Sequence, residues 1–339
     1  MSPDPAGFTC MAAAGLDEIR PGDDLGGLLS QQVPLADGDI LVVTSKVVSK
    51  AEGRVVSADR ASALAGETDR VVARRGETLI VRTTHGLVMA AAGIDASNTE
   101  PGTVVLLPAD PDGSARALRE RIGADGGPNV AVVVSDTVGR AWRNGQTDIA
   151  IGAAGLEVIL DHAGLPDGYG NVLEVTAPAV ADEVAAAADL VKGKVGRAPA
   201  AVLRGLGHLV CPRGDHGSGA GALIRDESLD MFGLGAREAV LHAVQGDAAG
   251  LRGFGSPAPV RELTAALRQS CPAAKVHVAQ DGRVDVRVAG ANGNAAQRAL
   301  GGDEARLVAV AFAMGWTPTP EVAQGTGTDV LLGFRAATP

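Results

Sequence analysis

Three short polar segments follow apolar runs that have the composition of buried strands. They are "TSKVVSKAEGR" (44–54), "AAAGIDASN" (90–98) and the polar half of "VVVSDTVGRAWRNGQTDIAIGAAGL" (132–156). Their carboxylates, hydroxyls, lysines and arginines are groups that bind divalent cations and anionic oxygens in proteins. If the fold brings the segments together, they predict one site for a metal ion and a phosphorylated substrate.

The first segment carries two lysines, Lys46 and Lys50, at the spacing that places both on one face of a helix. If that helix begins at Thr44 or Ser45, its first backbone N–H groups have no partner within the helix and are open to an anion. A strand end, a helix start and two stacked lysines suit phosphate oxygens. The spacing alone equally allows a solvated, basic helix face.

The other two segments each supply an aspartate near the end of an apolar run. Asp95 and Asn98 follow small residues, where a turn built on Asp or Asn is the commoner meaning. Asp136 and Thr137 follow the apolar run that ends at Val134. Two aspartates and a hydroxyl at neighbouring strand ends would bind Mg²⁺ or Mn²⁺, with water and phosphate oxygens as the remaining ligands.

Two arginines, Arg140 and Arg143, follow Asp136 by four and seven residues in the third segment. Their guanidinium groups suit bidentate contacts with a substrate carboxylate or phosphate. The alternative is a surface ion pair with Asp148 or Glu174. No residue stands out as a general base, so the catalytic residues remain unknown.

A glycine-rich run, "HGSGAG" (216–221), has the composition of a loop whose backbone N–H groups wrap a phosphate. The same composition is typical of a flexible loop. The chain contains no GxxxxGK[ST] phosphate loop.

The composition of the whole chain limits its class. The 339 residues are 46% hydrophobic and 21% charged, which indicates a globular protein. The net charge of -10 argues against non-specific binding to nucleic acid or to an anionic membrane surface. Three widely spaced cysteines without a Cys/His pattern argue against a structural zinc ion. No run is long and apolar enough to predict a membrane span, and no targeting segment stands out, so we expect a cytoplasmic protein.

Strand-like and helical patterns are mixed along the chain, which predicts an α+β (mixed α/β) fold. We expect a main domain at residues 1–245 and a small C-terminal α/β domain at residues 246–339. The strands are expected at residues 39–43, 78–82, 86–91, 129–134, 200–203, 275–278, 283–288 and 329–334. The helices are expected from residue 44, from a cap at Ser114, and at residues 178–191, 260–268 and 303–314.

The quoted segments resemble the coenzyme F420-0:γ-glutamyl ligases. Further matching stretches run in the family's order between residues 12 and 245: "GLDEIRPGDDL" (15–25), "DGDILVVTSKVVSKAEGR" (37–54), "YGNVLEVTAPAVADEVAAAADLVKGK" (169–194) and "IRDESLDMF" (224–232). The chain looks most like the actinobacterial form, in which the ligase is fused to a flavin-binding, nitroreductase-like domain. The C-terminal segment, residues 246–339, is too short for that domain, so we expect neither a bound flavin nor reductase activity.

The resemblance implies roles for named residues. A guanine nucleotide pocket would be lined by Leu16, Asp17, Glu18 and Ile19, and the nucleotide would also contact Ser45, Lys46, Lys50 and Asn98. Asp95 and Asp136 would hold one divalent ion, and Thr137 would contact a second. The family's α+β fold dimerises with its sites near the subunit interface, which implies a homodimer.

The resemblance also implies an activity: GTP-dependent joining of L-glutamate to the deazaflavin precursor F420-0 through an acyl phosphate, with chain extension through the γ-carboxylate as a further step. Mg²⁺ or Mn²⁺ would assist, and K⁺ is a further candidate ion. The competing hypothesis is a non-catalytic module that binds GTP and metal and regulates or scaffolds a separate enzyme.

Overall fold

The computed structural model describes residues 7–97, 99–193, 198–319 and 328–337. The chain forms two compact units, Met1–Ile224 and Arg225–Pro339. This division falls before the expected boundary at residue 245, because helix α6 (Ala236–Gln245) packs against α8 (Asn294–Ala313) of the second unit. Within the described ranges, no helix has both the length and the apolar character needed to cross a membrane.

A five-stranded sheet in the order β1-β10-β2-β8-β9 forms the centre of the first unit. The β2–β8 pair is parallel, and the other three pairings are antiparallel. The strands are β1 (Thr9–Ala13), β2 (Ile40–Thr44), β8 (Ala131–Gly139), β9 (Gln146–Ala154) and β10 (Ala200–Arg204). Expected strands at residues 39–43, 129–134 and 200–203 are thus confirmed, although β8 continues five residues beyond Val134.

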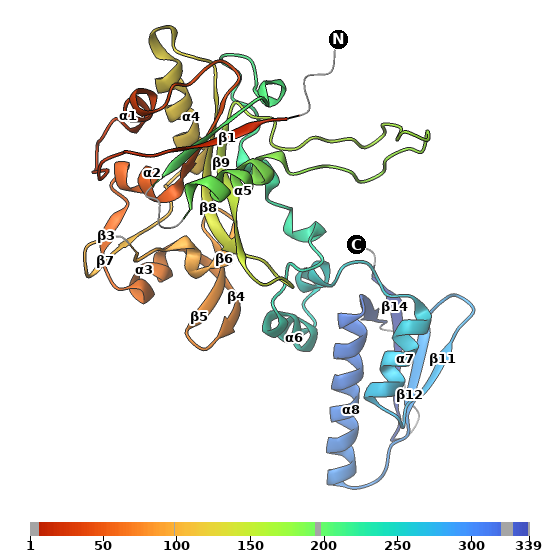
Figure 1. The fold of residues 1–339 in the computed structure, drawn as a ribbon. Coiled ribbons are helices and arrows are strands. Elements are labelled where there is room, and N and C mark those ends of the chain that lie inside the picture. Colours follow the sequence, from red (N-terminus) through yellow and green to blue (C-terminus); the bar gives the residue numbers. More distant parts are fainter. Residues whose placement is uncertain (1–6, 98, 194–197, 320–327, 338–339) are drawn as a thin grey trace. The chain divides into compact units, whose positions relative to one another are not determined.

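Both faces of this sheet are buried, because successive strand residues point to opposite sides. Leu41 and Val43 pack with α1, α2 and α4, whereas Ile40 and Val42 pack with α5. These helices are α1 (Leu25–Gln32), α2 (Ser45–Ala51), α4 (Pro111–Gly123) and α5 (Val180–Lys192). Figure 1 shows α5, in green, crossing one side of the sheet. The near-continuous apolar sequence of β2 and β8 follows from this double burial.

Two smaller sheets extend the first unit, in the orders β4-β5-β6 and β3-β7. They enclose a core that includes Val81, Ile94 and Val104. Their elements are β3 (Val55–Ser57), α3 (Arg60–Glu67), β4 (Thr68–Arg75), β5 (Thr78–Thr83), β6 (Val88–Ala90) and β7 (Thr103–Val105). A 3₁₀ turn, η1 (Ala91–Gly93), leads from β6 to Asp95, which bridges to Val105.

The η1 turn has an unusual backbone. Ala91 and Ala92 have φ values of 50° and 54°, and Gly93 follows at 70°. Left-handed backbone is unfavourable for residues with a Cβ, so the surrounding packing must hold it. Ala92 is 1% exposed, and a Cβ on Gly93 would lie 2.7 Å from the Leu107 side chain. The turn is therefore fixed, and it fixes the direction in which the chain reaches Asp95.

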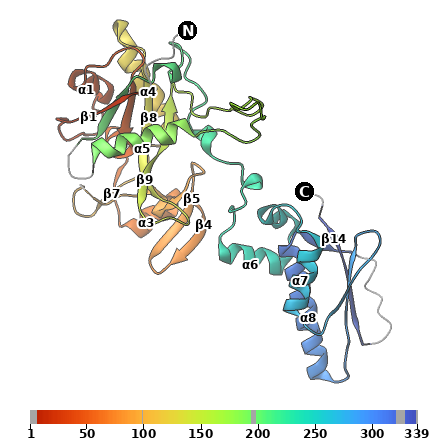
Figure 2. The same cartoon turned by 45° about the vertical axis from the view of Figure 1, so that its right-hand side comes forward.

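The second unit is an antiparallel sheet in the order β11-β12-β14-β13 with α7 and α8 on its buried face (Figure 2). Its elements are α7 (Val260–Ser270), β11 (Lys275–Val278), β12 (Val284–Val288), β13 (Trp316–Pro318) and β14 (Val330–Ala336), with α6 and α8 as given above. The apolar side chains of α8 are covered within the second unit, since Leu307 and Ala311 belong to the core between the helices and the sheet of this unit.

The described residues also form short 3₁₀ helices besides η1, at Ala124–Gly126, Gly207–Leu209, Ala220–Leu223, Glu227–Leu229 and Ala248–Phe254.

The mixed α+β class expected from the sequence is confirmed, and two expected helix starts are wrong. The helix assigned a cap at Ser114 begins at Pro111, because the Asp110 carboxylate accepts the Gly113 N–H and caps it there. The helix expected from residue 303 begins at Asn294. Its first nine residues include two glycines at 301 and 302, which weaken the helical signal in the sequence.

Leu307 is fully buried in the core of the second unit, so Leu307→Ala should lower the free energy of unfolding of that unit by about 2–5 kcal/mol. The chain has two tryptophans: Trp142 is 90% exposed, and Trp316 is buried in the second unit. Urea unfolding followed by fluorescence in a Trp142→Phe background therefore reports this unit. Gln297→Ala, on an exposed position of the same helix, should shift the transition little. An equal shift in both variants would contradict the assignment of Leu307 to the core.

Candidate active site

The start of α2 links two carboxylates that lie far apart in the sequence. Ser45 Oγ donates to Asp136 Oδ1 at 3.1 Å, and Lys46 Nζ lies 2.5 Å from Asp95 Oδ2. Because Ser45 and Lys46 are consecutive, with Cα atoms about 3.8 Å apart, both carboxylates lie near this helix start. The fold therefore brings the three polar segments together, as the sequence predicts.

Asp95 is held by an ion pair and by a turn. Lys46 Nζ also donates to the Ser97 carbonyl and hydroxyl oxygens, at 3.1 and 2.9 Å. The Asp95 carboxylate accepts the Ser97 N–H at 2.6 Å, which confirms the turn considered for this residue. Burial raises the pKa of the Asp95 carboxyl, but the hydrogen bonds from Lys46 and Ser97 outweigh it, so the pKa lies below its ordinary value. Asp95 is thus an ionised carboxylate that already has a cationic partner.

Lys50 is paired with Glu18, and this contact joins the N-terminal segment to α2. The Lys50 side chain is only 11% exposed, so the alternative of a solvated basic helix face is wrong. Ile19 is buried and Leu16 packs against the same core. The segment expected at the nucleotide, residues 16–19, is therefore attached to α2 by the ion pair between Glu18 and Lys50. Asn98, expected beside them, lies outside the described residues.

Asp136 and Thr137 lie within β8 rather than after its end. Asp136 pairs with Ile149 of β9 and Thr137 pairs with Asp148. Strand alternation directs their side chains to opposite faces of the sheet. Asp136 accordingly meets Ser45 on the α2 side, whereas the Thr137 hydroxyl donates to Asp148 Oδ1 at 2.7 Å. The strand end predicted at Val134 is wrong because β9 continues to pair with the polar residues that follow.

A buried ion pair lies behind this part of β8. Asp148 is 4% exposed and Lys192, the last residue of α5, is 5% exposed. Lys192 Nζ lies 2.8 Å from both Asp148 Oδ2 and Ser135 Oγ. Burial raises the pKa of the Asp148 carboxyl, but Lys192 and the two hydroxyls outweigh it and the pKa lies below its ordinary value. The sequence pattern indicated Asp148 only as a partner for arginines and did not indicate Lys192. The sequence signal for this buried pair is Asp148 itself, a single carboxylate within the apolar strand β9.

The two arginines lie in the exposed turn between β8 and β9. Arg140 donates to the carbonyl of Asn144 within that turn at 3.4 Å. An ion pair with Asp148, considered from the sequence, is wrong because Asp148 is buried against Lys192. The contacts of Arg140 and Arg143 with a substrate remain a prediction.

The glycine-rich loop binds an internal carboxylate. Asp112, in the first turn of α4, accepts the N–H groups of Ala220 at 2.7 Å and Gly221 at 3.1 Å, and also that of Ala153 at 2.7 Å. A Cβ on Gly219, whose φ is 77°, would lie 2.5 Å from the Asp112 carboxylate. Two of the N–H groups considered for a phosphate are therefore used to join the loop to α4.

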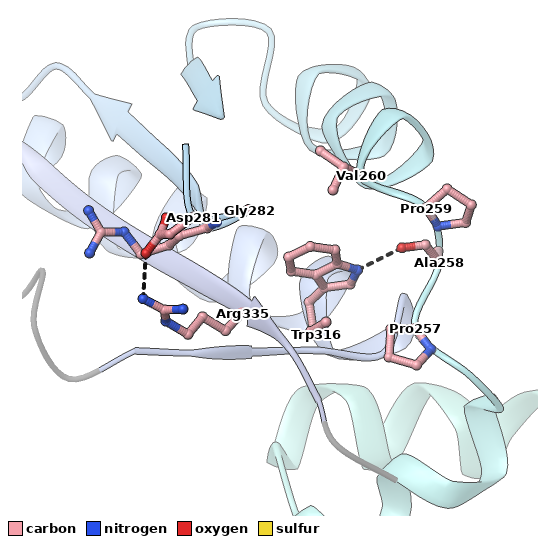
Figure 3. A pocket seen from close by; sticks show the side chains of 10 residues that line it. Pro257, Ala258, Pro259, Val260, Asp281, Gly282, Trp316 and Arg335 are labelled. Carbon is pink, nitrogen blue, oxygen red and sulfur yellow. Dashed lines mark hydrogen bonds and ion pairs between the residues drawn. The ribbon is translucent and has the colours of Figure 1, made fainter. Parts of the chain in front are cut away.

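The second unit contains a separate pocket with a volume of about 460 Å³ (Figure 3). Trp316 forms part of its wall, and the indole Nε1 donates to the carbonyl of Ala258 at 2.9 Å. At the other side Arg335 Nη2 donates to Asp281 Oδ2 at 2.6 Å. Both of these contacts join residues of the pocket wall, and none of the residues predicted for the site lies there.

The residues at the start of α2 fit a divalent cation. Asp95 already attracts the Lys46 ammonium group, and both Asp95 and Asp136 offer the hard oxygen donors that Mg²⁺ and Mn²⁺ prefer. Among the residues that the structure describes, no three His, Cys, Asp or Glu side chains gather into a metal cluster. Water and phosphate oxygens would therefore supply the remaining ligands.

The lowered pKa of Asp148 predicts how stability depends on pH. A carboxyl whose pKa is lower in the folded state contributes stability that is present above its ordinary pKa of 3.8 and is lost as the pH falls through the folded value. Asp148→Asn leaves the Lys192 ammonium buried without its charge partner and should cost about 3–5 kcal/mol near neutral pH. Urea unfolding should show the difference from wild type shrinking as the pH falls below 3.8. A difference that stays constant across that range would contradict the assignment.

Comparison with known proteins identifies the family of this chain. A family model described as F420-0:Gamma-glutamyl ligase matches residues 15–67 and 58–205. The chain is 39% identical over 236 residues to the coenzyme F420:L-glutamate ligase of Methanopyrus kandleri, covering 63% of this chain and 93% of the relative. Identity to the protein of the same name from Methanothermobacter thermautotrophicus is 37% over 254 residues, covering 67% and 99%.

The same name belongs to a relative from Archaeoglobus fulgidus, 44% identical over 212 residues, with coverage of 57% and 85%. Each relative is matched over most of its length, and the family model ends at residue 205, inside the first unit. All three polar segments lie within the matched range. The chain belongs to the F420-0:γ-glutamyl ligase family.

Proposed function

We propose that this protein is a ligase that joins L-glutamate to the terminal carboxylate of the coenzyme F420 precursor, F420-0, using GTP. Membership of the ligase family supports the reaction class and the substrates. The single observation that carries the nucleotide-dependent mechanism is the start of α2, where two lysines and two carboxylates gather around Ser45. The enzyme would also extend the chain through γ-linked glutamates, and it would work as a homodimer.

The chemistry requires activation of the acceptor carboxylate. An amine cannot displace oxide from a carboxylate, because oxide is a very poor leaving group. Transfer of the γ-phosphoryl group from GTP to a carboxylate oxygen gives an acyl phosphate and GDP. The amino group of L-glutamate then attacks the acyl carbon, loses a proton and displaces inorganic phosphate, which leaves an amide bond.

The protein's part in this sequence is electrostatic and positional. Lys46 and Lys50 bind phosphate oxygens by exchanging their contacts with Asp95 and Glu18 for contacts with the nucleotide. Asp95 and Asp136 would hold a divalent cation, which would supply positive charge to offset that of the phosphates. Ser45 orients the Asp136 carboxylate through its hydroxyl group.

The remaining predicted residues would border the substrates. Leu16 to Ile19 form one side of the guanine pocket, joined to α2 through Glu18, and Asn98 adds a polar contact. Arg140 and Arg143 would attract a substrate carboxylate or phosphate from the β8–β9 turn. Thr137 would contact a second divalent ion.

Mass spectrometry of the products tests the reaction most simply. F420-0, GTP, Mn²⁺ and L-glutamate should give a product heavier by one glutamyl residue, and phosphate release should require both F420-0 and glutamate. Omission of either substrate is the internal control. GTP binding without product, by protein that is folded and pure, would instead favour the regulatory module.

Asp136→Asn should fold normally but lose at least about 100-fold in ligation, because an amide supplies no charge for a divalent cation near the phosphates. Rates measured at limiting Mn²⁺ make the comparison sensitive. Glu183→Gln, an exposed change on α5, should keep wild-type activity. Full activity of Asp136→Asn at limiting Mn²⁺ would remove Asp136 from the cation site.

Lys50→Ala should weaken GTP binding by about 10- to 100-fold, the effect expected when a charged hydrogen bond is lost, and should affect glutamate binding much less. Calorimetric titration of each substrate measures both. Lys275→Ala, an exposed lysine of the second unit, is the matched control and should leave GTP affinity unchanged. Unaltered GTP affinity in Lys50→Ala would place Lys50 outside the nucleotide site.

A further inference from the structure

We propose that Asp148 and Lys192 are positioning residues for Asp136, acting from the opposite face of the sheet by holding the two residues that flank it. The inference rests on the proposed cation site at Asp95 and Asp136. It extends the site to a buried group that the reaction described above does not use.

Asp148 is bonded to both neighbours of Asp136 in the sequence. Ser135 Oγ donates to Asp148 Oδ2 at 2.9 Å, and Thr137 Oγ1 donates to Asp148 Oδ1 at 2.7 Å. Each carboxylate oxygen therefore fixes one side of the segment 135–137. Since Asp136 lies between two anchored residues and points the other way, its carboxylate has little freedom to turn from the start of α2.

Lys192 fixes the carboxylate in turn. Its ammonium group contacts both Asp148 Oδ2 and Ser135 Oγ at 2.8 Å, so the carboxylate, one hydroxyl and the ammonium group form a closed triangle. Lys192 is supplied by the last turn of α5, which packs against β9. The segment around Asp136 is thus connected to a helix on the far side of the sheet.

The burial of this pair argues against a role in stability alone. Moving two charges out of water is costly, and replacing a buried ion pair with apolar residues of similar size is often neutral or stabilising. Asp148, Lys192 and Ser135 are all at most 5% exposed. The site next to it requires a defined carboxylate geometry, and partners that orient metal-binding groups commonly change metal affinity by about 10- to 100-fold.

The test compares Mn²⁺ affinity with stability in variants of the full chain. In the double variant Asp148→Asn, Lys192→Met, the charge pair is removed together, so neither partner is left as an unpaired buried charge. Its Mn²⁺ dissociation constant, measured from the electron paramagnetic resonance signal of free Mn²⁺, should rise about 10- to 100-fold. Its urea midpoint should stay close to wild type.

Two further comparisons separate positioning from general destabilisation. Ser135→Ala removes one anchor at a residue that has no assigned ion contact, and it should weaken Mn²⁺ binding. Asp39→Asn breaks another buried carboxylate contact, with Arg204, at the opposite end of β2. That variant should lose stability without losing Mn²⁺ affinity.

Asp136→Asn identifies which idea fails. If it binds Mn²⁺ as wild type does, the cation is not held by Asp136, and the positioning role falls with that assignment, while the product assay still judges the ligase reaction. If Asp136→Asn loses Mn²⁺ but the double variant and Ser135→Ala do not, the cation site stands and the positioning role is wrong. If Asp39→Asn weakens Mn²⁺ binding as much as the double variant does, the effect is structural and the proposal is overturned.

Discussion

The parallel pairing of β2 with β8 determines where everything else in the site lies. Parallel strands end at the same edge of a sheet, and here Thr44 pairs with Ser135. The residue after Thr44 is Ser45, which begins α2, and the residue after Ser135 is Asp136, so the register brings the two side chains within hydrogen-bond distance. A shift of one residue would direct Asp136 to the face of α5 and separate it from α2.

The two cores maintain that register. Each face of β2 and β8 packs against helices, and a slipped strand would move valines and leucines out of both cores at once. Burying each such side chain stabilises the fold by about 1.5–3 kcal/mol, so the penalty for slipping is large. The packing of apolar side chains therefore sets the register, and the register sets the positions of Ser45 and Asp136.

Three lysines at or behind the site are each paired with a carboxylate. Lys46 is paired with Asp95, Lys50 with Glu18 and Lys192 with Asp148. The first two pairs have partly exposed carboxylates and can exchange partners when an anion and a cation bind together. The third is buried, which suits a fixed support rather than a group that changes partner during the reaction.

The sequence predicted the central strands and the α+β class, because both depend on local apolar patterns. It also predicted a shared site for the three polar segments, on the condition that the fold brings them together. It did not predict the extent of β8, since Ser135 to Thr137 are polar and their place in the sheet depends on pairing with β9, to which β2 adds a partner at Ser135. It also missed Lys192, whose role depends on where α5 packs. The helix from Asn294 was predicted too short because its early glycines and polar residues hide the pattern.

The position of a bound metal ion tests the central claim most directly. Crystals grown with Mn²⁺ and GTP, measured at a wavelength where manganese scatters anomalously, would locate the ion without reference to any substitution. We predict a peak coordinated by the carboxylates of Asp95 and Asp136, with the Lys46 ammonium group moved from Asp95 to a phosphate oxygen. A peak away from both carboxylates, or a nucleotide bound with Lys46 still paired to Asp95, would contradict the account.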